Sequence, residues 1–503
     1  MTTININELM ESSGVQFGTS GVRGLVKDMT DHVCFTYVSA FLQYLAKQQS
    51  IQKGSRIGIA GDLRSSTPRI INAAAAACVA MGYEPINYGF IPSPAIALYG
   101  IEYDMPTIMV TGSHIPDDRN GIKFNTAQGE ILKPDEQGIR SQNITVEPTL
   151  FTDANGLVHQ DYLSTESNDA ELNYIKRFTD FLPTDCLINK SIGLYEHSSV
   201  SRDCFKRILE QLGASVTSLG RSEKFISVDT EAIRPEDVIL AKQWSQQHNF
   251  DCIISTDGDG DRPLISDENG NWLRGDVAGM LCAQYLNIGS VVTPVSSNSV
   301  VEKSNYFKNV IRTKIGSPYV IEAMQKEASG ADRTVAGYEA NGGFLQQTSI
   351  SMNHSVLSPL PTRDAVIVPI AIMLFAQQQK LTISQLLTTL PQRYTFSDRI
   401  KNFPIESSSK LINNMISNDA ETNLQTIKSL FNGIGDPITF DNTDGVRITF
   451  STDDVVHIRP SGNAPELRCY TESETTEKAE KLNQHCIEIL NKWRLADNKL
   501  EVE

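Results

Sequence analysis

The chain has 503 residues, and 44 Lys and Arg against 60 Asp and Glu leave a formal net charge of −16 at pH 7. This acidic balance excludes broad electrostatic binding to nucleic acid or to an anionic membrane, but not a small basic pocket for an anionic metabolite. Hydrophobic residues make up 40% of the chain and charged residues 21%, which excludes wholesale disorder. At roughly 150 residues per domain, the length predicts three or four domains.

The cysteines and the apolar stretches indicate the compartment. The eight cysteines are scattered and no CxxC occurs, so their spacing predicts neither a disulfide framework nor a zinc cluster. The first residues, MTTININELMES, lack the basic start and apolar core of a secretory signal. The most apolar stretches, 73–81 and 365–376, are shorter than the about 20 residues that a membrane-spanning helix needs. We therefore expect buried core elements and a cytoplasmic protein.

Short apolar runs alternate with helix-like stretches through most of the chain. Strands are predicted at residues 56–60, 107–111, 191–195 and 250–256. Helices are predicted at residues 67–81, 204–212 and 235–247. This alternation is typical of α/β layering, in which ligands bind at the strand-to-loop junctions. No internal repeat is visible, although three units of similar size could conceal a diverged one.

The last hundred residues follow a different pattern. Residues 445–450 and 455–459 predict a strand pair around the turn STDD, and the polar stretch at roughly 405–425 predicts helix and loop. A long helix is predicted after the strand pair, because apolar residues recur on one face at a spacing of three to four: Ala479, Leu482, Cys486, Ile489, Leu490 and Trp493. The sequence thus predicts a separate, small α+β domain.

The strongest chemical signal is the segment DGDGDRP at residues 257–263. Asp257, Asp259 and Asp261 are separated only by glycine, so a tight loop can direct three carboxylates at one hard cation, Mg²⁺ or Ca²⁺. An EF-hand is excluded because Arg262 stands where its loop needs glycine and because the flanks look like strands. A haloacid-dehalogenase-type loop would need Thr or Val where Asp261 stands. The alternative is an acidic surface turn, in which three uncompensated carboxylates would repel one another.

A second segment, TGSHIPDDRNGIKF at residues 111–124, contains a candidate nucleophile. Gly112 allows a sharp exit from an apolar strand, so we expect Ser113 at an exposed strand-to-loop tip. His114, Arg119 and Lys123 bring cations close to whatever Ser113 carries. No GxSxG elbow surrounds this serine, which argues against a triad hydrolase. Taken alone, a Ser-His pair in a polar loop is more often a hydrogen-bonded turn.

Two further segments contain candidate ligand-binding residues. RPSGNAPE follows a predicted strand, and its Arg459, Ser461, Asn463 and glycine amide suit a phosphate, although alone it is a Pro/Gly-rich turn. GYEANGGF places Glu339 and Asn341 beside flexible glycines, which suits sugar hydroxyls but is a weak signal by itself. FGTSGVRG, at residues 17–24, matches neither GxGxxG nor the Walker motif, so dehydrogenase and kinase functions lose support.

Together and in this order, these segments resemble the α-D-phosphohexomutase family, the phosphomannomutases and phosphoglucomutases. FGTSGVRG and DGDGDR match as they stand, TGSHIP…NGIKF is a variant of TASHNP…NGIKF, and GDLRSS (61–66) approximates GRDxRxSS. YEANGG corresponds to the E-x-[SN]-G sugar loop, and RPSGNAPELR to RPSGTEP-x-x-R. The matches extend from Phe17 to Arg468, and chance agreement of all of them in order is negligible.

The resemblance implies an α/β fold with four domains around a cleft: three related α/β domains with mixed sheets and a smaller C-terminal α+β domain. The first domain, residues 1–155, would contain the phosphoserine loop, and the second, residues 156–268, the metal loop. The third, residues 269–383, would contain the sugar-binding loop, and the fourth, residues 384–503, the phosphate-binding loop.

The resemblance also implies residue roles. Ser113 would be the phosphoserine and would hold Mg²⁺ together with Asp257, Asp259 and Asp261. Further catalytic residues at the transfer site would be Arg23, His114, Lys123 and Arg262, with Lys123 the proton carrier. Glu339 and Asn341 would bind the sugar hydroxyls. The phosphate that is not transferred would be bound by Arg459, Ser461, Gly462 and Asn463.

The implied reaction interconverts hexose 6-phosphate and hexose 1-phosphate, of mannose or glucose, with hexose 1,6-bisphosphate as intermediate and activator. Phosphoglucosamine mutase is the alternative within the class, and a Mg²⁺-dependent sugar phosphatase or a non-catalytic sugar-phosphate binder are alternatives outside it. We expect small sugar phosphates as the partners of a monomer or small homo-oligomer. Gly343 stands where many members have a histidine, and Asn463 where threonine is usual, so neither the acid-base group nor the preferred sugar follows from the resemblance.

Overall fold

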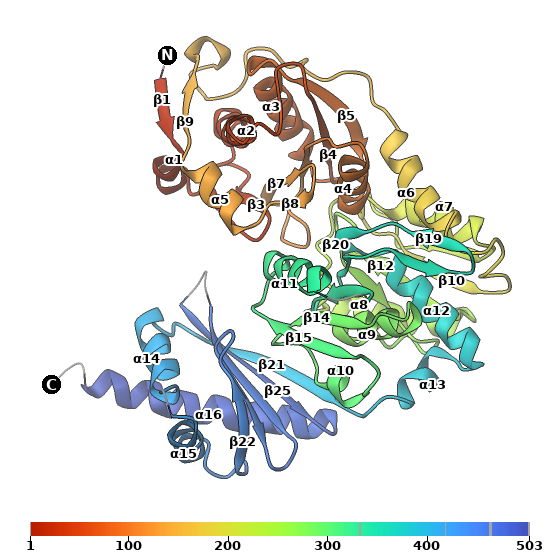
Figure 1. Ribbon diagram of the computed structural model, residues 1–503, viewed down its shortest axis with the longest axis vertical. Coiled ribbons are helices and arrows are strands. Elements are labelled where there is room, and N and C mark those ends of the chain that lie inside the picture. The colour runs from red at the N-terminus through yellow and green to blue at the C-terminus, as the bar shows by residue number, and fades with distance from the viewer. Residues whose placement is uncertain (1, 331–332, 418, 462–464, 501–503) are drawn as a thin grey trace. The chain divides into compact units, whose positions relative to one another are not determined.

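The computed structural model describes residues 2–330, 333–417, 419–461 and 465–500. The chain divides into two compact units, residues 1–291 with 316–386 and residues 292–315 with 387–503. Figure 1 labels their helices and strands. Within the described residues, no helix combines the length and the apolar character needed to cross a bilayer.

The first unit begins with a sheet of seven strands and its helices. Its elements are β1 (Thr2–Asn5), α1 (Ile6–Ser13), β2 (Gln16–Phe17), β3 (Gly21–Leu25), α2 (Asp31–Lys47), β4 (Arg56–Gly61), α3 (Thr67–Ala80), β5 (Glu84–Phe90), α4 (Ser93–Glu102), β6 (Thr107–Val110), β7 (Arg119–Thr126), β8 (Gly129–Glu130), α5 (Lys133–Arg140) and β9 (Asn143–Val146). The strand order is β2-β3-β7-β6-β4-β5, with β8 paired to β7 and with β1 and β9 forming a separate pair.

The second group of elements forms a sheet of four strands. Its elements are α6 (Asp169–Thr179), β10 (Ser191–Tyr195), α7 (Arg202–Gln211), β11 (Ser215–Leu219), α8 (Pro235–Gln247), β12 (Cys252–Thr256) and β13 (Pro263–Ile265). The third group comprises α9 (Gly275–Tyr285), β14 (Ser290–Pro294), α10 (Val300–Lys303), β15 (Asn309–Thr313), α11 (Ser317–Gly330), β16 (Val335–Tyr338), β17 (Phe344–Gln346), β18 (Ile350–Met352), β19 (Ser355–Leu357), β20 (Leu360–Asp364), α12 (Ile367–Gln379) and α13 (Ile383–Thr388).

One strand order occurs three times along the chain. Four consecutive strands lie in the order second, first, third, fourth, as β5-β4-β6-β7, β11-β10-β12-β13 and β15-β14-β16-β17. The first three strands are parallel and the fourth is antiparallel in the first two sheets, so these sheets are mixed, as expected. The shared order is the internal repeat that the amino-acid sequence does not reveal by eye.

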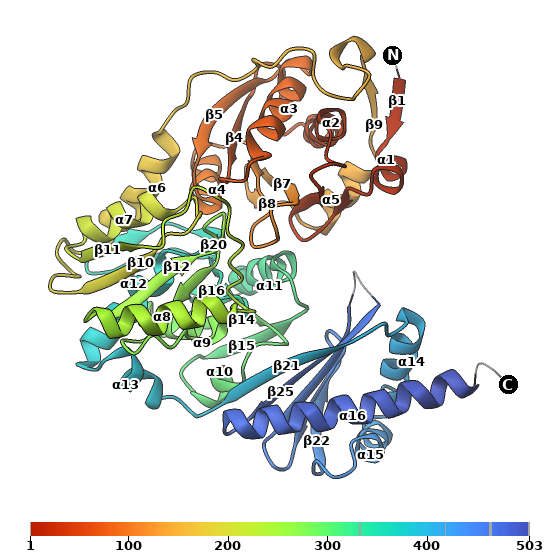
Figure 2. The same ribbon diagram turned by 180° about the vertical axis from the view of Figure 1, so that it is seen from behind.

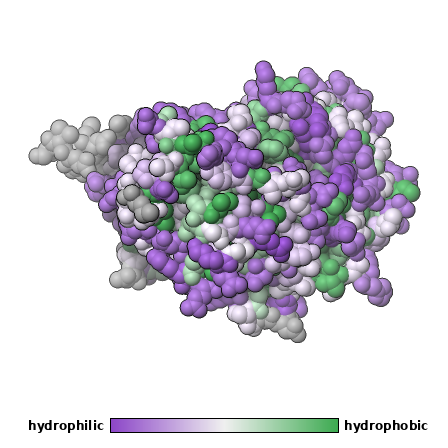
Figure 3. Space-filling view, turned by 90° about the horizontal axis from the view of Figure 1, so that it is seen from above, coloured by the Kyte–Doolittle hydropathy of each residue, from purple (hydrophilic) through white to green (hydrophobic). Residues whose placement is uncertain are grey.

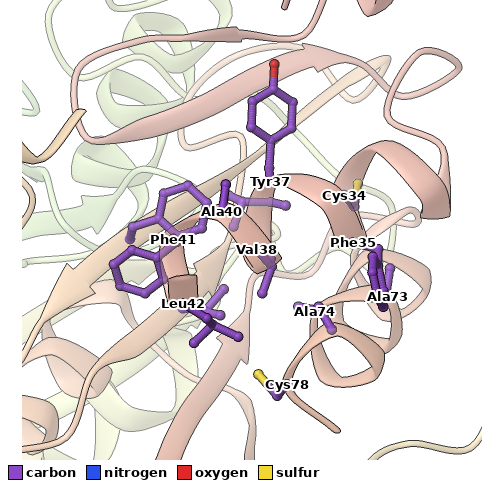
Figure 4. Close-up of a cluster of buried hydrophobic side chains, with 14 of the residues drawn as sticks. Cys34, Phe35, Tyr37, Val38, Ala40, Phe41, Leu42, Ala73, Ala74 and Cys78 are labelled. Atoms are coloured by element: carbon purple, nitrogen blue, oxygen red, sulfur yellow. The ribbon is translucent and has the colours of Figure 1, made fainter. Parts of the chain in front are cut away.

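A core between helices and sheet holds the first of these sheets in place. Figure 4 shows the alanine-rich α3 beside the larger side chains of α2. Small residues let the two helices approach closely, and on the sheet side the rings of Phe41 and Phe124 stack with their centroids 4.7 Å apart. The predicted helix at 67–81 corresponds to α3, which begins with Pro68 in its first turn and stops before Gly82, whose φ is +75°.

The second unit contains the predicted C-terminal domain. Besides α10 and β15, the elements of this unit are β21 (Tyr394–Lys401), α14 (Ile405–Met415), α15 (Ala420–Leu430), β22 (Pro437–Asp441), β23 (Val446–Phe450), β24 (Val455–Pro460), β25 (Glu466–Ser473) and α16 (Thr476–Leu500). The sheet order is β21-β25-β24-β23-β22, and Figures 1 and 2 show α16 along one face of this sheet. The predicted strand pair is confirmed as β23 and β24, and the predicted helix as α16.

The prediction for this domain was incomplete, because β25 lies between the strand pair and the helix in the chain and β21 and β22 complete the sheet. β25 reads ELRCYTES, in which buried Leu467, Cys469 and Thr471 alternate with less buried polar residues. That alternation is a strand signal, but it is short and mostly polar, so the sequence alone conveys it weakly. Elsewhere the predicted strands and helices correspond to β4, β6, β10, β12, α7 and α8.

The surface mixes residue types. In the face shown in Figure 3, hydrophilic residues cover most of the area and hydrophobic residues form small, separated groups. The large exposed hydrophobic side chains come from different elements, for example Val79 of α3, Ile239 of α8 and Val356 of β19. Isolated residues of this kind are normal on a folded protein and indicate no docking site.

Two buried histidines predict how stability depends on pH. His197 and His457 are at most 2% exposed, and each ring Nε2 donates to a backbone carbonyl, that of Thr256 or Asp444. Burial lowers the pKa of each imidazole to about 4. Since the unfolded chain binds these protons near pH 6.5, the unfolded state takes up more protons than the folded state between pH 6.5 and 4. We expect stability to fall as the pH falls through this window.

A single substitution isolates one of these histidines. Between pH 7 and pH 5, the free energy of unfolding should decrease less in His457→Gln than in the wild type, by roughly 1–2 kcal/mol. This is the contribution of one buried histidine that takes up a proton only in the unfolded state. Urea unfolding at pH 7, 6 and 5 measures it. An unchanged difference between pH 7 and pH 5 would show that His457 is not buried in its neutral form.

Candidate active site

Three loops of the first unit leave equivalent positions of the repeated sheets. The Ser113 loop follows β6, the Asp257–Asp261 loop follows β12, and the Glu339–Asn341 loop follows β16. Each loop therefore connects the third strand to the fourth strand of its sheet. Because strand order is the same in all three sheets, segments far apart in the sequence take equivalent positions at a sheet edge.

Arg64 fixes the loop that contains Ser113. Its side chain is buried, and Nε donates to Asp62 Oδ2 at 3.1 Å. Nη1 donates to the backbone carbonyls of Pro116 and Arg119, and Nη2 to those of Ser113 and Ile115, at 2.6–3.0 Å. One guanidinium thus binds four carbonyls of a seven-residue turn. A Cβ at Gly112 would lie 2.6 Å from Arg64 Cζ, so this close approach requires glycine.

Ser113 is buried, which differs from the exposed tip expected from the sequence. Its residue exposure is 9%, and its Oγ donates to Asp257 Oδ2 at 2.6 Å and lies 3.3 Å from His114 Nδ1. Its φ of +53° is in the left-handed region, where a non-glycine backbone is strained. The Arg64 contacts and the hydrogen bond from the Ser113 amide to Thr111 Oγ1 hold it there. The serine therefore faces the metal loop rather than solvent.

The metal loop brings its three carboxylates together. Asp257, Asp259 and Asp261 are at most 1% exposed, and one oxygen of each lies within 4.8 Å of the others. The loop lies between β12 and β13, so the strand-like flanks that excluded an EF-hand are confirmed. Ser93, at the start of α4, donates to Asp259 Oδ2 at 2.6 Å and so ties this loop to the first sheet.

Cations compensate this negative charge. Lys123 Nζ lies 2.6 Å from Asp259 Oδ2 and 2.7 Å from Asp261 Oδ2. Burial lowers the pKa of Lys123, but the two carboxylates outweigh burial and raise it overall, which favours the charged ammonium. Burial, followed by repulsion from Asp259 and Asp261, raises the pKa of Asp257 well above its usual range. Full ionisation of the triad therefore needs further positive charge.

The donor set fits a small hard cation. Oδ1 of Asp259 and Oδ1 of Asp261 are buried and accept no hydrogen bond from the described residues. Carboxylate oxygens are the ligands that Mg²⁺ prefers, and a divalent ion would offset the repulsion that acts on Asp257. A phosphoryl group on Ser113, whose Oγ already lies against Asp257, would supply a further oxygen.

The remaining predicted transfer residues surround Ser113. A cavity of about 40 Å³ is lined by Ser113, His114, Lys123, Arg23, Arg262 and Arg363, together with residues of β3 and its preceding turn. Arg262 Nη1 donates to His114 Nδ1 at 2.8 Å. Burial, then Arg262, lowers the pKa of His114 to about 4, so its imidazole is neutral at pH 7. The cavity is cationic, as a site for a phosphoryl group requires.

The sugar loop is tightly folded. Glu339 and Asn341 are 5% and 7% exposed. The amide of Gly343 donates to Asn341 Oδ1 at 2.9 Å, so this oxygen is engaged within the loop. A Cβ at Gly275 would lie 2.3 Å from the Gly342 nitrogen, so α9 begins directly against the loop. Glu339 reaches the metal loop through Arg363, as described below.

The predicted phosphate loop belongs to the second unit. Arg459, at the end of β24, donates from Nε to Asp444 Oδ2 at 2.9 Å, and the Ser461 amide donates to the Glu466 carbonyl at 2.9 Å. Gly462 and Asn463 lie outside the described residues. Convergence of this loop with the Ser113 cavity stays a prediction.

Comparison with known proteins agrees with this geometry. The four domain models described as phosphoglucomutase/phosphomannomutase match the chain: α/β/α domain I at residues 14–147, domain II at 173–270, domain III at 274–394, and the C-terminal domain at 411–489. The chain belongs to the phosphoglucomutase/phosphomannomutase family.

Relatives within the family match nearly the whole chain. A phosphomannomutase of Salmonella muenchen is 44% identical over 475 residues, covering 94% of this chain and 95% of the relative. A phosphomannomutase of Sinorhizobium fredii is 40% identical over 479 residues, covering 95% and 99%. The crystal structure of a phosphoglucomutase/phosphomannomutase family protein from Burkholderia thailandensis is 19% identical, with a TM-score of 0.71 and coverage of 95% and 97%, and it supports the fold. The predicted architecture, three related α/β domains and a smaller C-terminal domain, is confirmed.

Sequence reasoning missed several residues of this phosphohexomutase site. Arg64 lies in GDLRSS, which was noted as a family-like motif, but its role needs the fold to be seen. Arg363 lies in LPTRDAV, which contains no glycine and only one acidic residue, Asp364. Glu130 is buried and accepts hydrogen bonds from Ser20, Ser317 and Thr362. The contacts that these three side chains make in the structure indicate their roles, and no sequence motif does.

Proposed function

We propose that this chain is a phosphohexomutase that interconverts hexose 6-phosphate and hexose 1-phosphate, with mannose as the first candidate sugar. The observation that carries the proposal is the hydrogen bond of 2.6 Å from Ser113 Oγ to Asp257 Oδ2, beside a cationic cavity that includes Arg23, Lys123 and Arg262. This pairs a phosphoryl carrier with a metal-binding carboxylate and with cations that offset the charge of a phosphate.

The reaction follows from these groups. The phosphoryl group of phospho-Ser113 passes to the free hydroxyl of the sugar phosphate, so the Ser113 Oγ–P bond breaks, a new O–P bond forms, and the hydroxyl gives up its proton. The product is a hexose 1,6-bisphosphate. The bisphosphate then reorients in the site, so that its other phosphoryl group is transferred to Ser113 and the sugar oxygen that it leaves gains a proton. No phosphate is gained or lost over the cycle.

Residues of the chain position the reacting groups and offset the negative charge of the phosphoryl group. Asp257, Asp259 and Asp261 would hold Mg²⁺, which neutralises charge on the transferring phosphoryl group when it is bound. Arg23, His114 and Arg262 line the cavity beside Ser113. Lys123 is the proposed proton carrier, and it must leave the Asp259 and Asp261 carboxylates to accept a proton, because these carboxylates favour its charged form.

Substrate binding is assigned to the other two loops. We propose that Glu339 and Asn341 bind sugar hydroxyls, and that the phosphate that stays on the sugar is bound by Arg459, Ser461, Gly462 and Asn463. Mannose is placed first because the two relatives described above, 44% and 40% identical to this chain, are named phosphomannomutases. We also propose the domain boundaries 1–155, 156–268, 269–383 and 384–503. The cytoplasmic location, the absence of nucleic-acid and membrane partners, and a monomer or small homo-oligomer remain predictions.

An activity assay with phosphosite mapping tests the proposal. The purified protein should carry one phosphoryl group at Ser113 and should interconvert mannose 1-phosphate and mannose 6-phosphate, with stimulation by a hexose 1,6-bisphosphate. Excess chelator should reduce the rate at least about 100-fold, since the metal ion supplies several kcal/mol of charge stabilisation. Adding back Mg²⁺ should restore the rate.

Parallel substrates separate the alternatives. Faster turnover of glucosamine phosphates than of mannose phosphates would favour a phosphoglucosamine mutase. Release of inorganic phosphate in place of isomerised sugar would favour a phosphatase. Binding of sugar phosphates with neither product would leave a non-catalytic binder. Full activity in excess chelator would refute the metal assignment.

A further inference from the structure

Position 343 is where the chain departs from the family motif, and the structure shows what occupies the space. A Cβ on Gly343 would lie 2.5 Å from Cδ and 2.6 Å from Cγ of Arg363. Real Cβ atoms do not approach carbon this closely, so the Arg363 side chain occupies the space that a side chain at position 343 would need. Any larger residue at 343, including the histidine of many members, would require Arg363 to be elsewhere.

Arg363 connects the two loops that flank this space. Its Nε donates to Asp261 Oδ2 at 2.9 Å, Nη2 lies 2.9 Å from the same oxygen, and Nη1 donates to Glu339 Oε2 at 3.2 Å. The side chain is 4% exposed, and it lines the cavity beside Ser113 and Lys123. One guanidinium therefore joins the metal loop to the sugar loop.

The backbone of β20 places Arg363 for this role. β20 pairs antiparallel with β17, with Asp364 opposite Phe344, so Arg363 lies beside the end of the sugar loop. The preceding residue, Thr362, donates to Glu130, which also accepts from Ser20 in the turn before β3. Arg363 is thus anchored from both sides, and its planar fork is pre-organised for two carboxylates in a way that a lysine is not.

We propose that Arg363 is a positioning residue of the transfer site: it ties Glu339 of the sugar loop to Asp261 of the metal loop through the space that Gly343 leaves open. Glu339 is left with Oε1 to accept from a sugar hydroxyl, at a fixed distance from Ser113. Arginine keeps its proton at all accessible pH values. Arg363 therefore fills the space that a histidine at position 343 would need, but it cannot serve as an acid-base group. The inference rests on the proposed function.

Four variants test the coupling: Arg363→Gln, Arg363→Ala, Gly343→Ala, and Arg363→Ala combined with Gly343→Ala. Arg363→Gln should lower kcat roughly 100-fold, the usual result of misplacing a substrate contact by about 1 Å, with a smaller change in KM. Gly343→Ala should cause a similar loss, because its methyl group displaces Arg363. In the Arg363→Ala background, Gly343→Ala should cost less than about twofold, because the two substitutions act on one contact.

A second readout does not depend on activity. The guanidinium of Arg363 offsets part of the negative charge of Asp261 and so competes with a bound cation. Arg363→Gln should therefore bind Mg²⁺ more tightly, by roughly tenfold, in isothermal titration of the dephosphorylated protein. Arg363→Lys should recover the metal affinity of the wild type but not its kcat. Arg69→Gln is the matched control: Arg69 pairs with buried Asp31 at 2.5 Å, away from the cavity, and its loss should lower thermal stability without changing kcat or Mg²⁺ affinity.

Either of two results would overturn the proposal: independent, additive losses for the two positions, or a loss of stability in Arg363→Gln with kcat and Mg²⁺ affinity unchanged. Failure of the proposed function is distinguishable, because it would appear as a wild-type protein that isomerises no hexose phosphate. In that case Mg²⁺ affinity and melting temperature would still report whether Gly343 and Arg363 are coupled.

Discussion

Ser113→Ala should abolish mutase activity, with a loss of roughly 10⁴-fold or more in kcat, as expected when the group that forms the covalent intermediate is removed. The serine is the proposed carrier of the phosphoryl group, and its Oγ donates to Asp257 Oδ2 at 2.6 Å, a contact that no other hydroxyl of the described residues makes. The variant should also lack the phosphoryl group in its intact mass. A mannose phosphate interconversion assay and phosphosite mapping provide the two measurements.

The fold should survive this substitution. Arg64 binds backbone carbonyls of the loop, not the Ser113 side chain, so the turn keeps its anchors. The cost is the hydrogen bond to buried Asp257, about 1–3 kcal/mol. Ser199→Ala is a matched control, because Ser199 is also buried and its Oγ lies 2.6 Å from Thr256 Oγ1 at the start of the same metal loop. Ser199→Ala should lose stability but keep its phosphoserine. Mutase activity retained by Ser113→Ala would refute the mechanism.

Arg64→Met should have the second large effect, on stability and on activity together. Removing the guanidinium leaves Asp62 buried at 0% exposure without its ion pair, and breaking such a pair costs about 3–5 kcal/mol. It also frees four carbonyls of the loop that holds Ser113. We expect kcat to fall at least about 100-fold, since the attacking geometry depends on that loop. Chemical denaturation and the same mutase assay measure the two losses.

A double variant separates these two losses. Asp62→Asn removes the buried charge, so Arg64→Met with Asp62→Asn should regain part of the unfolding free energy. It should not regain kcat, because the second substitution restores none of the hydrogen bonds to the carbonyls of Pro116, Ile115 or Arg119. Arg64→Lys, which keeps the charge but not the planar fork, should fold well and still turn over slowly. Recovery of kcat in the double variant would show that Arg64 acts through stability alone.

The elements with strong local patterns were predictable from the sequence. The alanine-rich run before Gly82, the apolar strand SIGLY and the apolar face of α16 each follow from residue periodicity and its end signals. Of the five strands in the sheet of the C-terminal domain, only β23 and β24 were predicted, because β21 and β22 each bury one residue and β25 is rich in polar residues. Their strand character comes from pairing with neighbours, which a single sequence does not display.

The active-site chemistry divides in the same way. The clustering of Asp257, Asp259 and Asp261 could be predicted from the sequence, because their spacing within one tight loop directs three carboxylates to one point. Ser113 was predicted as a candidate nucleophile from its own loop, but its burial was not predicted, because it faces Asp257, which lies 144 residues away in the chain. Arg64 and Arg363 act on backbone or carboxylates of other segments, so their roles have no local pattern at all.

The sequence by itself determined the acidic charge of −16, the order of the motifs and the residue types that can hold a cation and a phosphoryl group. Only the tertiary structure decided that three loops leave equivalent positions of three sheets with one strand order, and that Arg363 fills the space beside Gly343. The physical reason is that spacing along the chain controls contacts within a turn, whereas contacts between distant segments depend on how the sheets pair and pack. Of the 44 lysines and arginines of this acidic chain, the fold brings Arg23, Lys123, Arg262 and Arg363 to the cavity beside Ser113.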